Sequence, residues 1–188
     1  MSSLVSTVRC VHDAAFGVLS RLAQGWFLGL AARLVFSSVT MVFFLNSAKT
    51  KVGSGFPDIL IPQIGAYAQI VPSVAEAAGY NPDNIAFFWK LVVLAGTYAE
   101  FLLPVLLLLG LLTRLVSLAM IGFVAVMSIV DVWFHQLDAA SIGAMFDRLP
   151  TALILDQRLL WLFPLVYLVI KGAGKISLDG LFASRANG

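Results

Sequence analysis

Charged residues are scarce in this chain, and their scarcity excludes most kinds of soluble protein. Only 12% of the 188 residues are charged and 60% are hydrophobic, whereas soluble domains carry about 25% charged residues. A mean hydropathy of +0.95 is typical of a membrane protein. The formal net charge of +2 is small and dispersed along the chain, so nothing in the sequence indicates binding to nucleic acid.

Cysteine and histidine are almost absent. The single cysteine, Cys10, permits no disulfide within the chain and no cysteine-rich metal site. The two histidines, His12 and His135, lie far apart on unlike segments, which argues against a bis-histidine haem site built from this chain alone. The sequence also lacks a glycine-rich phosphate loop, a GxSxG motif and an HExxH motif. It therefore points to no metal site and assigns no catalytic residue.

Residues 1–25 form an amphipathic segment and do not resemble a cleaved signal peptide. Arg9, Asp13 and Arg21 interrupt the apolar run that a signal peptide requires. Leu4–Leu22 is predicted to form a helix that lies at the membrane surface, and a mobile tail is the alternative. The apolar face of this predicted helix comprises Val8, Val11, Ala15, Leu19 and Leu22.

Four apolar segments are each long enough to cross about 30 Å of hydrocarbon at roughly 20 residues per helix. These segments are Trp26–Ser47, Ala86–Gly110, Leu115–His135 and Leu159–Lys171. The link between the second and third segments is so short that they must form an antiparallel hairpin. The sequence therefore predicts an all-α integral membrane four-helix bundle over residues 26–182, followed by a polar tail. Prolines in residues 48–85 predict short helices over the mouth of the bundle.

The loops carry a weak signal of orientation, because four spans place both termini on one side of the membrane. Six Lys and Arg residues lie on the terminal side: Arg9, Arg21, Arg114, Lys171, Lys175 and Arg185. Five lie on the other side: Lys49, Lys51, Lys90, Arg148 and Arg158. An excess of cationic residues marks the cytoplasmic side, so both termini are predicted to be cytoplasmic.

Glu100 is the most informative residue of the sequence, because it lies inside the second apolar segment. A charge at the centre of a membrane helix costs roughly 2.5 kcal/mol or more, so such a residue usually faces a bundle interior and has a partner. Arg33, in the first segment, is predicted to be that partner. Such a bridge either fixes helix register or takes part in handling a ligand or protons.

Polar residues at helical spacing predict which helix faces meet inside the bundle. The first segment carries such a stripe at Arg33, Ser37, Thr40 and Ser47, and the third at Ser117, Ser128, Asp131 and His135. A second polar cluster is expected at the non-cytoplasmic mouth: Asn46, Lys49, Lys90, Asp131, His135, Asp156 and Arg158. It is predicted either to bind a polar group and relay protons or to be ordinary interfacial charge pairing.

Three stretches together resemble the DoxX family of small four-helix bacterial membrane proteins. They are Arg33–Phe36 leading to Asn46–Lys49, then Glu100–Arg114, and finally Asp156–Trp161 with Gly172–Asp179. The resemblance spans residues 26–182, and Arg33, Glu100 and Arg114 match the recurring charged positions of the family. It implies a four-helix bundle in the bacterial inner membrane, with Arg114 anchoring a cytoplasmic turn.

The resemblance is less specific about activity. The family takes its name from the small subunit of an archaeal thiosulfate:quinone oxidoreductase, and other relatives resemble membrane partners in thiol or oxidative-stress systems. The leading hypothesis is a membrane subunit of a quinone- or thiol-linked redox system, with a quinone as the expected ligand and a redox protein as partner. A single cysteine argues against independent dithiol chemistry. The alternatives are a non-catalytic membrane scaffold and a small transporter or proton conduit.

Overall fold

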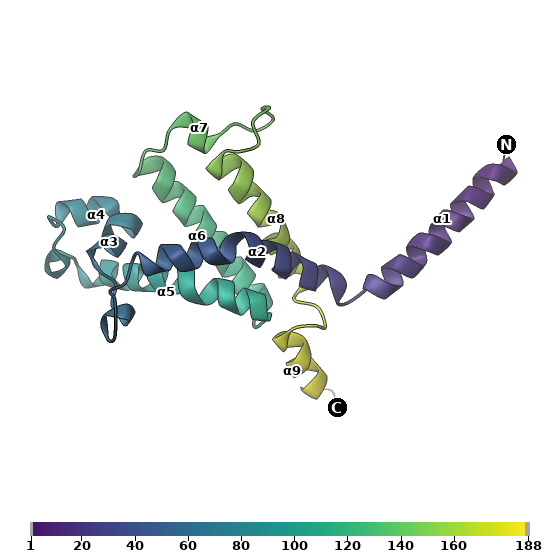
Figure 1. Cartoon of the computed structure of the whole chain (residues 1–188), viewed down its shortest axis with the longest axis horizontal. Helices are drawn as coiled ribbons and strands as arrows, with labels where there is room; N and C mark the ends of the chain where they lie inside the picture. The colour runs from purple at the N-terminus through teal and green to yellow at the C-terminus, as the bar shows by residue number, and fades with distance from the viewer. Residues whose placement is uncertain (1, 187–188) are drawn as a thin grey trace.

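The computed structural model describes residues 2–186, with side chains from residue 5, and it is built from α-helices. Four of its helical segments are long and apolar enough to cross a membrane: α2 (Phe27–Lys49), α5 (Phe87–Leu109), α6 (Thr113–Trp133) and the continuous segment Leu153–Lys171. The predicted all-α membrane bundle is therefore confirmed, and the chain is a multi-pass membrane protein. Figure 1 shows the four segments beside one another.

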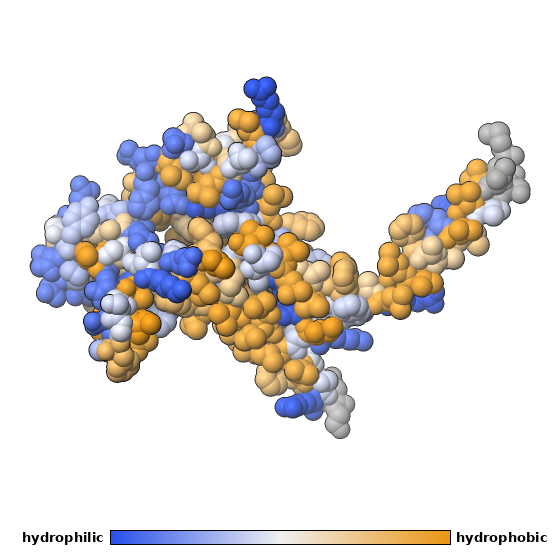
Figure 2. All heavy atoms as spheres, viewed as in Figure 1, coloured by the Kyte–Doolittle hydropathy of each residue, from blue (hydrophilic) through white to orange (hydrophobic). Residues whose placement is uncertain are grey.

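The four spanning helices form a closed arrangement in which α2 and α6 each contact both α5 and α8. The residues at the centre are large and apolar, and they include Phe36, Phe44, Leu107, Met120 and Leu165. The predicted polar stripes face inward over most of their length, since Ser37, Thr40 and Ser117 are buried, while His135 at the end of the second stripe is exposed. Hydrophobic residues cover much of the bundle face seen in Figure 2, and many large apolar side chains of the spanning helices are exposed, as expected of a surface that contacts lipid.

The two ends of the bundle differ. The turn end contains the α5–α6 turn, Gly110–Leu112, together with the start of α2 and the segment that follows α8. The loop end contains the long connections, residues 50–86 and 134–152, and hydrophilic residues gather there (Figure 2). The α5–α6 hairpin predicted from the short link is confirmed, and Figure 1 shows α6 diverging from α5 toward the loop end.

The turn end is held together by backbone and carboxylate hydrogen bonds. Asp179, in α9 (Leu178–Ala186), accepts hydrogen bonds from the backbone N–H groups of Leu112 and Thr113, at 2.7 and 2.8 Å. These N–H groups lie at the start of α6 and have no partner within that helix, so Asp179 caps it. The Asp179 N–H in turn donates to the Gly110 carbonyl, at 2.9 Å. The C-terminal segment is thereby fixed against the α5–α6 turn.

Gly29, in α2, should be intolerant of any side chain because a Cβ there would lie 2.5 Å from the Ala173 carbonyl oxygen. Replacing a helical glycine by alanine normally stabilises a helix by about 1 kcal/mol. We expect Gly29→Ala instead to destabilise the protein by about 1–3 kcal/mol through overpacking, measured by unfolding in mixed detergent micelles. Gly17→Ala, in α1, is the control because its Cβ would meet nothing within 4 Å. Equal stability of the two variants would contradict the close contact.

Short helices cover the loop end, and those in residues 48–85 are the ones that the prolines predict. They are η1 (Asp58–Leu60), α3 (Ile64–Ile70), α4 (Pro72–Ala77), η2 (Pro82–Asn84) and α7 (Ala139–Ile142). A second apolar cluster fixes α3 and α4 to α5 through Ala66, Tyr67, Ala75 and Val93. Burial raises the pKa of the Tyr67 phenol, which therefore stays neutral. Asp138 caps α7 by accepting a hydrogen bond from the Ser141 N–H, which lowers the pKa of its carboxyl group.

The predicted fourth span begins too late. The sequence places its start at Leu159, but the helix begins at Leu153 with the π-helical turn η3 (Leu153–Arg158), which continues into α8 (Leu159–Lys171). The charged groups of this turn have partners inside the structure, since Asp156 accepts a hydrogen bond from the Ala152 N–H and the buried Arg158 pairs with Asp131. Charges that appeared to end the span are therefore part of it.

The predicted N-terminal helix is present as α1 (Ser2–Ala23). Figure 1 shows α1 pointing away from the bundle. The predicted apolar face is exposed along the helix, with Val8 65%, Val11 64% and Leu22 69% accessible. Its placement on a membrane surface stays a prediction.

Candidate functional site

A cavity of about 630 Å³ lies inside the bundle toward the loop end. Its two long walls are α5 and α6, and the last turns of α2, with Phe43 and Ser47, also line it. Gln69 and Ile70 of α3 contribute to the lining from the covering loop. Most lining side chains are apolar, but seven polar ones belong to the same cavity: Ser47, Lys51, Gln69, Glu100, Asp131, His135 and Arg158.

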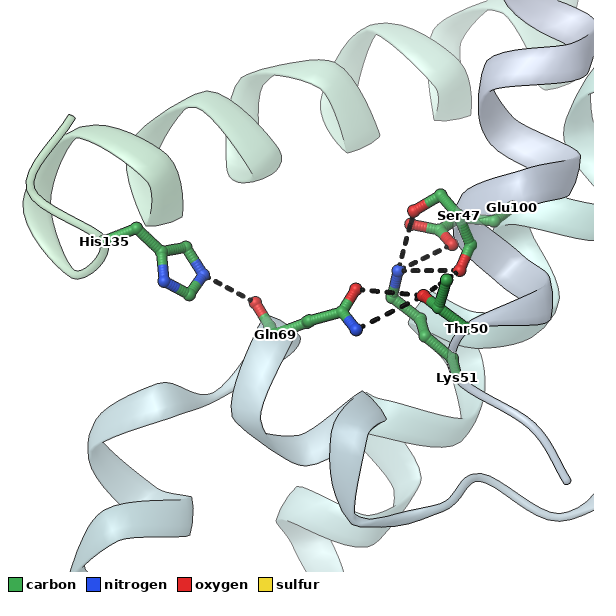
Figure 3. Close-up of polar contacts among 6 residues, drawn as sticks. All are labelled: Ser47, Thr50, Lys51, Gln69, Glu100 and His135. Carbon is green, nitrogen blue, oxygen red and sulfur yellow. Dashed lines mark hydrogen bonds and ion pairs between the residues drawn. The ribbon is translucent and has the colours of Figure 1, made fainter.

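Glu100 forms an ion pair with Lys51 on one wall of the cavity (Figure 3). The Lys51 Nζ lies 3.0 Å from Glu100 Oε2 and donates a hydrogen bond to Ser47 Oγ at 2.8 Å. The Ser47 hydroxyl donates in turn to Glu100 Oε1 at 3.3 Å. Both charged side chains are almost fully buried, at 4% and 5% exposure. The two charges and the hydroxyl therefore form one small network.

This network joins the middle of the spanning helix α5 to the loop end of α2. Glu100 is 13 residues after Phe87 and nine before Leu109, which places it about 20 Å and about 14 Å along the axis from the two ends of α5. Lys51 follows α2 by only two residues, and its side chain bonds back to the last turn of that helix through the Ser47 carbonyl. A charge at this depth requires a compensating partner, and Lys51 supplies it.

A second ion pair, between α6 and the fourth span, lines the same cavity. The Arg158 guanidinium donates through Nη2 to Asp131 Oδ2 at 2.5 Å and through Nη1 to Ser128 Oγ at 3.0 Å. Arg158 is buried, with 4% of its side chain exposed, and Asp131 is 23% exposed. The pair ties η3 to the loop-end half of α6 and places a second cation and anion at the polar end of the cavity.

His135 lies at the rim of the cavity, where α6 ends. Its Nε2 is 3.3 Å from the Gln69 carbonyl oxygen, and the Gln69 side chain bonds to the Thr50 hydroxyl (Figure 3). Gln69 thus links the end of α6, through α3, to the loop that carries Lys51. His135 is exposed, so it stands between solvent at the loop end and the buried pairs.

The polar end of the cavity is electrically balanced and keeps unused hydrogen-bonding capacity. Lys51 and Arg158 are matched by Glu100 and Asp131, so the four charges sum to zero. Arg158 Nε, a donor, is nevertheless buried without a hydrogen-bond partner among the described residues, and Glu100 Oε2, 3.0 Å from the Lys51 ammonium, can accept a second hydrogen bond. A buried polar atom without a hydrogen bond is energetically costly. The cavity therefore suits a neutral ligand that both donates and accepts.

The predicted bridge between Arg33 and Glu100 is wrong, although both side chains are buried. Arg33 donates through Nη1 to the Leu108 carbonyl at 2.7 Å and through Nη2 to the Ile176 carbonyl. Leu108 is eight residues beyond Glu100, or about 12 Å along α5. Arg33 therefore belongs to the turn end, where it joins α2, the end of α5 and the C-terminal segment. It lies outside the lining of the cavity.

The predicted cluster at the mouth is brought together only in part. Asp131, His135 and Arg158 line the cavity, whereas Lys49 and Lys90 do not. Lys49 is exposed at the end of α2, and Lys90 is partly exposed in the first turn of α5. Arg114 lies in the first turn of α6 at the turn end, against a shallower pocket of about 400 Å³. The structure thus separates the predicted residues into two groups at opposite ends of the bundle.

Lys51 is the functional candidate that sequence reasoning missed, although a signal was present. The polar stripe of the first span includes Arg33 and Ser47, and Lys51 is 18 residues beyond Arg33, or five full helical turns. Because the predicted first span ended at Ser47, Lys51 was assigned to the following loop and was not counted in the polar stripe. The signal was its spacing of four from Ser47, the residue it now bonds.

The cavity has the properties of a binding site for a small neutral molecule. Its polar groups are donors, acceptors and proton carriers, and among residues 2–186 no three His, Cys, Asp or Glu side chains are grouped closely enough to hold a metal ion. Its volume lies within the range of about 300–1,000 Å³ that is common for ligand pockets. No protein-family model matches the chain, and neither a curated protein nor a solved structure is significantly similar to it.

Proposed function

We propose that the chain is a DoxX-like subunit of a redox system in the bacterial inner membrane, and that its cavity binds a quinone. The observation that carries the proposal is a cavity of about 630 Å³ inside a membrane bundle, apolar over most of its lining and charge-balanced at its polar end. A quinone combines an apolar, uncharged body with two oxygens that accept hydrogen bonds, and the quinol form also donates them. Both termini are proposed to be cytoplasmic.

The residues present fit this ligand. Arg158 Nε is an unused donor suited to a quinone carbonyl, and Glu100 Oε2, which Lys51 contacts at 3.0 Å, keeps a further acceptor site suited to a quinol hydroxyl. Lys51 holds Glu100 in place, and Ser128 and Asp131 orient Arg158. When bound, a quinone would supply two-electron, two-proton redox chemistry. His135 at the rim would exchange protons with the loop-end solvent.

The electrons would be exchanged with a partner protein. The chain has one cysteine, Cys10, which is exposed on α1 and far along the chain from the cavity. With one cysteine the chain has no dithiol of its own, and we propose that a second redox protein in the same system exchanges the electrons with the quinone. The chain is therefore proposed as an accessory oxidoreductase subunit and not as a complete enzyme.

Quinone binding by the purified protein tests the proposal. Titration with a benzoquinone carrying a decyl tail, followed by intrinsic tryptophan fluorescence in nanodiscs, should show saturable binding. Ala99 lines the cavity, and Ala99→Phe should fill part of it and lower the affinity at least about tenfold, a loss of about 1.4 kcal/mol. Ala125→Phe is the matched control, because Ala125 is exposed on α6 and lies outside the lining. No saturable binding by the wild type would overturn the proposal.

A non-catalytic membrane scaffold is the second candidate, and the position of α1 favours it. This 22-residue helix points away from the bundle with its apolar face exposed (Figure 1). A helix of this kind can bind a membrane surface or a partner. Removing residues 2–23 distinguishes the two functions. A scaffold should lose its co-purifying partner, whereas quinone binding in the bundle should persist.

A further inference from the structure

The cavity is open to the side of the bundle, between α5 and α6. Six of its lining residues on these two helices are small or β-branched: Ala95, Gly96, Ala99, Ala119, Gly122 and Val126. Four of them, Ala95, Ala119, Gly122 and Val126, are also exposed on the outside of the bundle. A residue that both lines a cavity and is exposed marks its opening. This opening faces the side of a spanning bundle, where the surroundings are lipid.

The opening lies near the middle of the membrane. Gly122 is nine residues after Thr113 and 11 before Trp133, so it is about 14 Å and about 17 Å along the axis from the two ends of α6. The hydrocarbon core is about 30 Å thick, which places Gly122 close to its centre. A Cβ at Gly122 would meet no atom within 4 Å, so the opening is not filled by the chain's own side chains. A solute confined to water would not reach the cavity by this route.

We infer that the ligand of the cavity is a tailed lipid that enters sideways from the bilayer and leaves its hydrocarbon tail between α5 and α6. The small residues of α5 and α6 that line the cavity supply the space for a single tail. The neutral head reaches the ion pairs Lys51–Glu100 and Arg158–Asp131. This inference rests on the proposed quinone function and adds that a long isoprenoid tail is part of what the site recognises.

The opening can be closed without touching the polar end of the cavity. A variant with Ala119→Leu and Gly122→Leu places two larger side chains in the gap, both on the exposed side of α6. Ala125→Leu is the control, since it adds the same side chain to the same helix outside the cavity. Two probes are compared in nanodiscs: a benzoquinone with a decyl tail and the same ring without a tail. Binding is followed by tryptophan fluorescence, and folding by the thermal transition.

For the tailed probe we expect the closed variant to lose affinity at least about tenfold, and for the tailless ring the change should be less than about twofold. The control should bind both probes as the wild type does. Unchanged binding of the tailed probe by a folded closed variant would overturn the inference while leaving the quinone site intact. If the wild type binds neither probe, the proposed function fails and this inference fails with it. If the affinity of the closed variant for both probes falls equally, the opening does not bind the tail specifically and the inference is wrong.

Discussion

We expect Lys51→Met to destabilise the protein by about 3–5 kcal/mol, because it leaves the Glu100 carboxylate buried without its counter-charge. Methionine preserves most of the apolar stem of lysine, so the loss of stability measures the removal of the ammonium charge and not a loss of packing. The free energy of unfolding can be measured in mixed micelles with an increasing fraction of denaturing detergent. Lys90→Met is the matched control, because Lys90 lies on α5 outside the cavity and forms no ion pair among the described residues.

The partner of Glu100 can be identified by double-mutant cycles. Adding Glu100→Leu to Lys51→Met removes both charges, and since a buried ion pair can often be replaced by apolar groups at little cost, the double variant should recover most of the lost stability. The cycle between Arg33 and Glu100 should instead be additive to within about 0.5 kcal/mol, as expected of residues that share no contact. Strong coupling between Arg33 and Glu100, with none between Lys51 and Glu100, would support the bridge predicted from the sequence and contradict the ion pair seen in the structure.

The periodicity of the sequence predicted the bundle well, because a membrane helix is specified mainly by length and hydrophobicity. The first three spans, the α5–α6 hairpin and the short helices over the loop end all follow from such local patterns. The inward direction of the polar stripes follows too, since Ser37, Thr40 and Ser117 are buried at the spacing predicted. The boundary that was misplaced furthest is the start of the fourth span, where buried charges resemble the end of a membrane segment.

The pairing of charges was not predictable from the same patterns, because it depends on how far one helix is shifted along another. Arg33 and Glu100 were the two conspicuous charges inside predicted spans, and a long arginine side chain makes many pairings feasible in depth. The structure shows that backbone carbonyls compete with carboxylates for a guanidinium: Arg33 bonds two carbonyls at the turn end. The lysine that does pair with Glu100 lies just past the end of α2. Helix ends are the positions that sequence reading locates least well.

Arg33→Met should loosen the turn end, because Arg33 bridges the end of α5 to the C-terminal segment through the Leu108 and Ile176 carbonyls. Hydrogen bonds to a charged group contribute about 1.5–3 kcal/mol each. The variant loses two of them but no longer has a guanidinium to bury, so we expect the free energy of unfolding to fall by about 2–4 kcal/mol. The local consequence is faster trypsin cleavage after Lys175, which is exposed and directly precedes Ile176. Cleavage can be followed by mass spectrometry under conditions in which the protein remains folded.

Lys49→Met provides the control for this second effect, because Lys49 is exposed on the same helix as Arg33. Lys51→Met is a stricter comparison: it destabilises the loop end but should leave cleavage after Lys175 unchanged below the unfolding transition.

Asp179→Ala should act at the same place as Arg33→Met, since Asp179 caps α6 from the same C-terminal segment. Once either variant has released that segment, the other has less left to disrupt, so their effects on cleavage should be less than additive. Additive effects would mean that Arg33 and Asp179 hold the segment independently, and equal cleavage of Lys51→Met and Arg33→Met would mean that the two ends of the bundle open together.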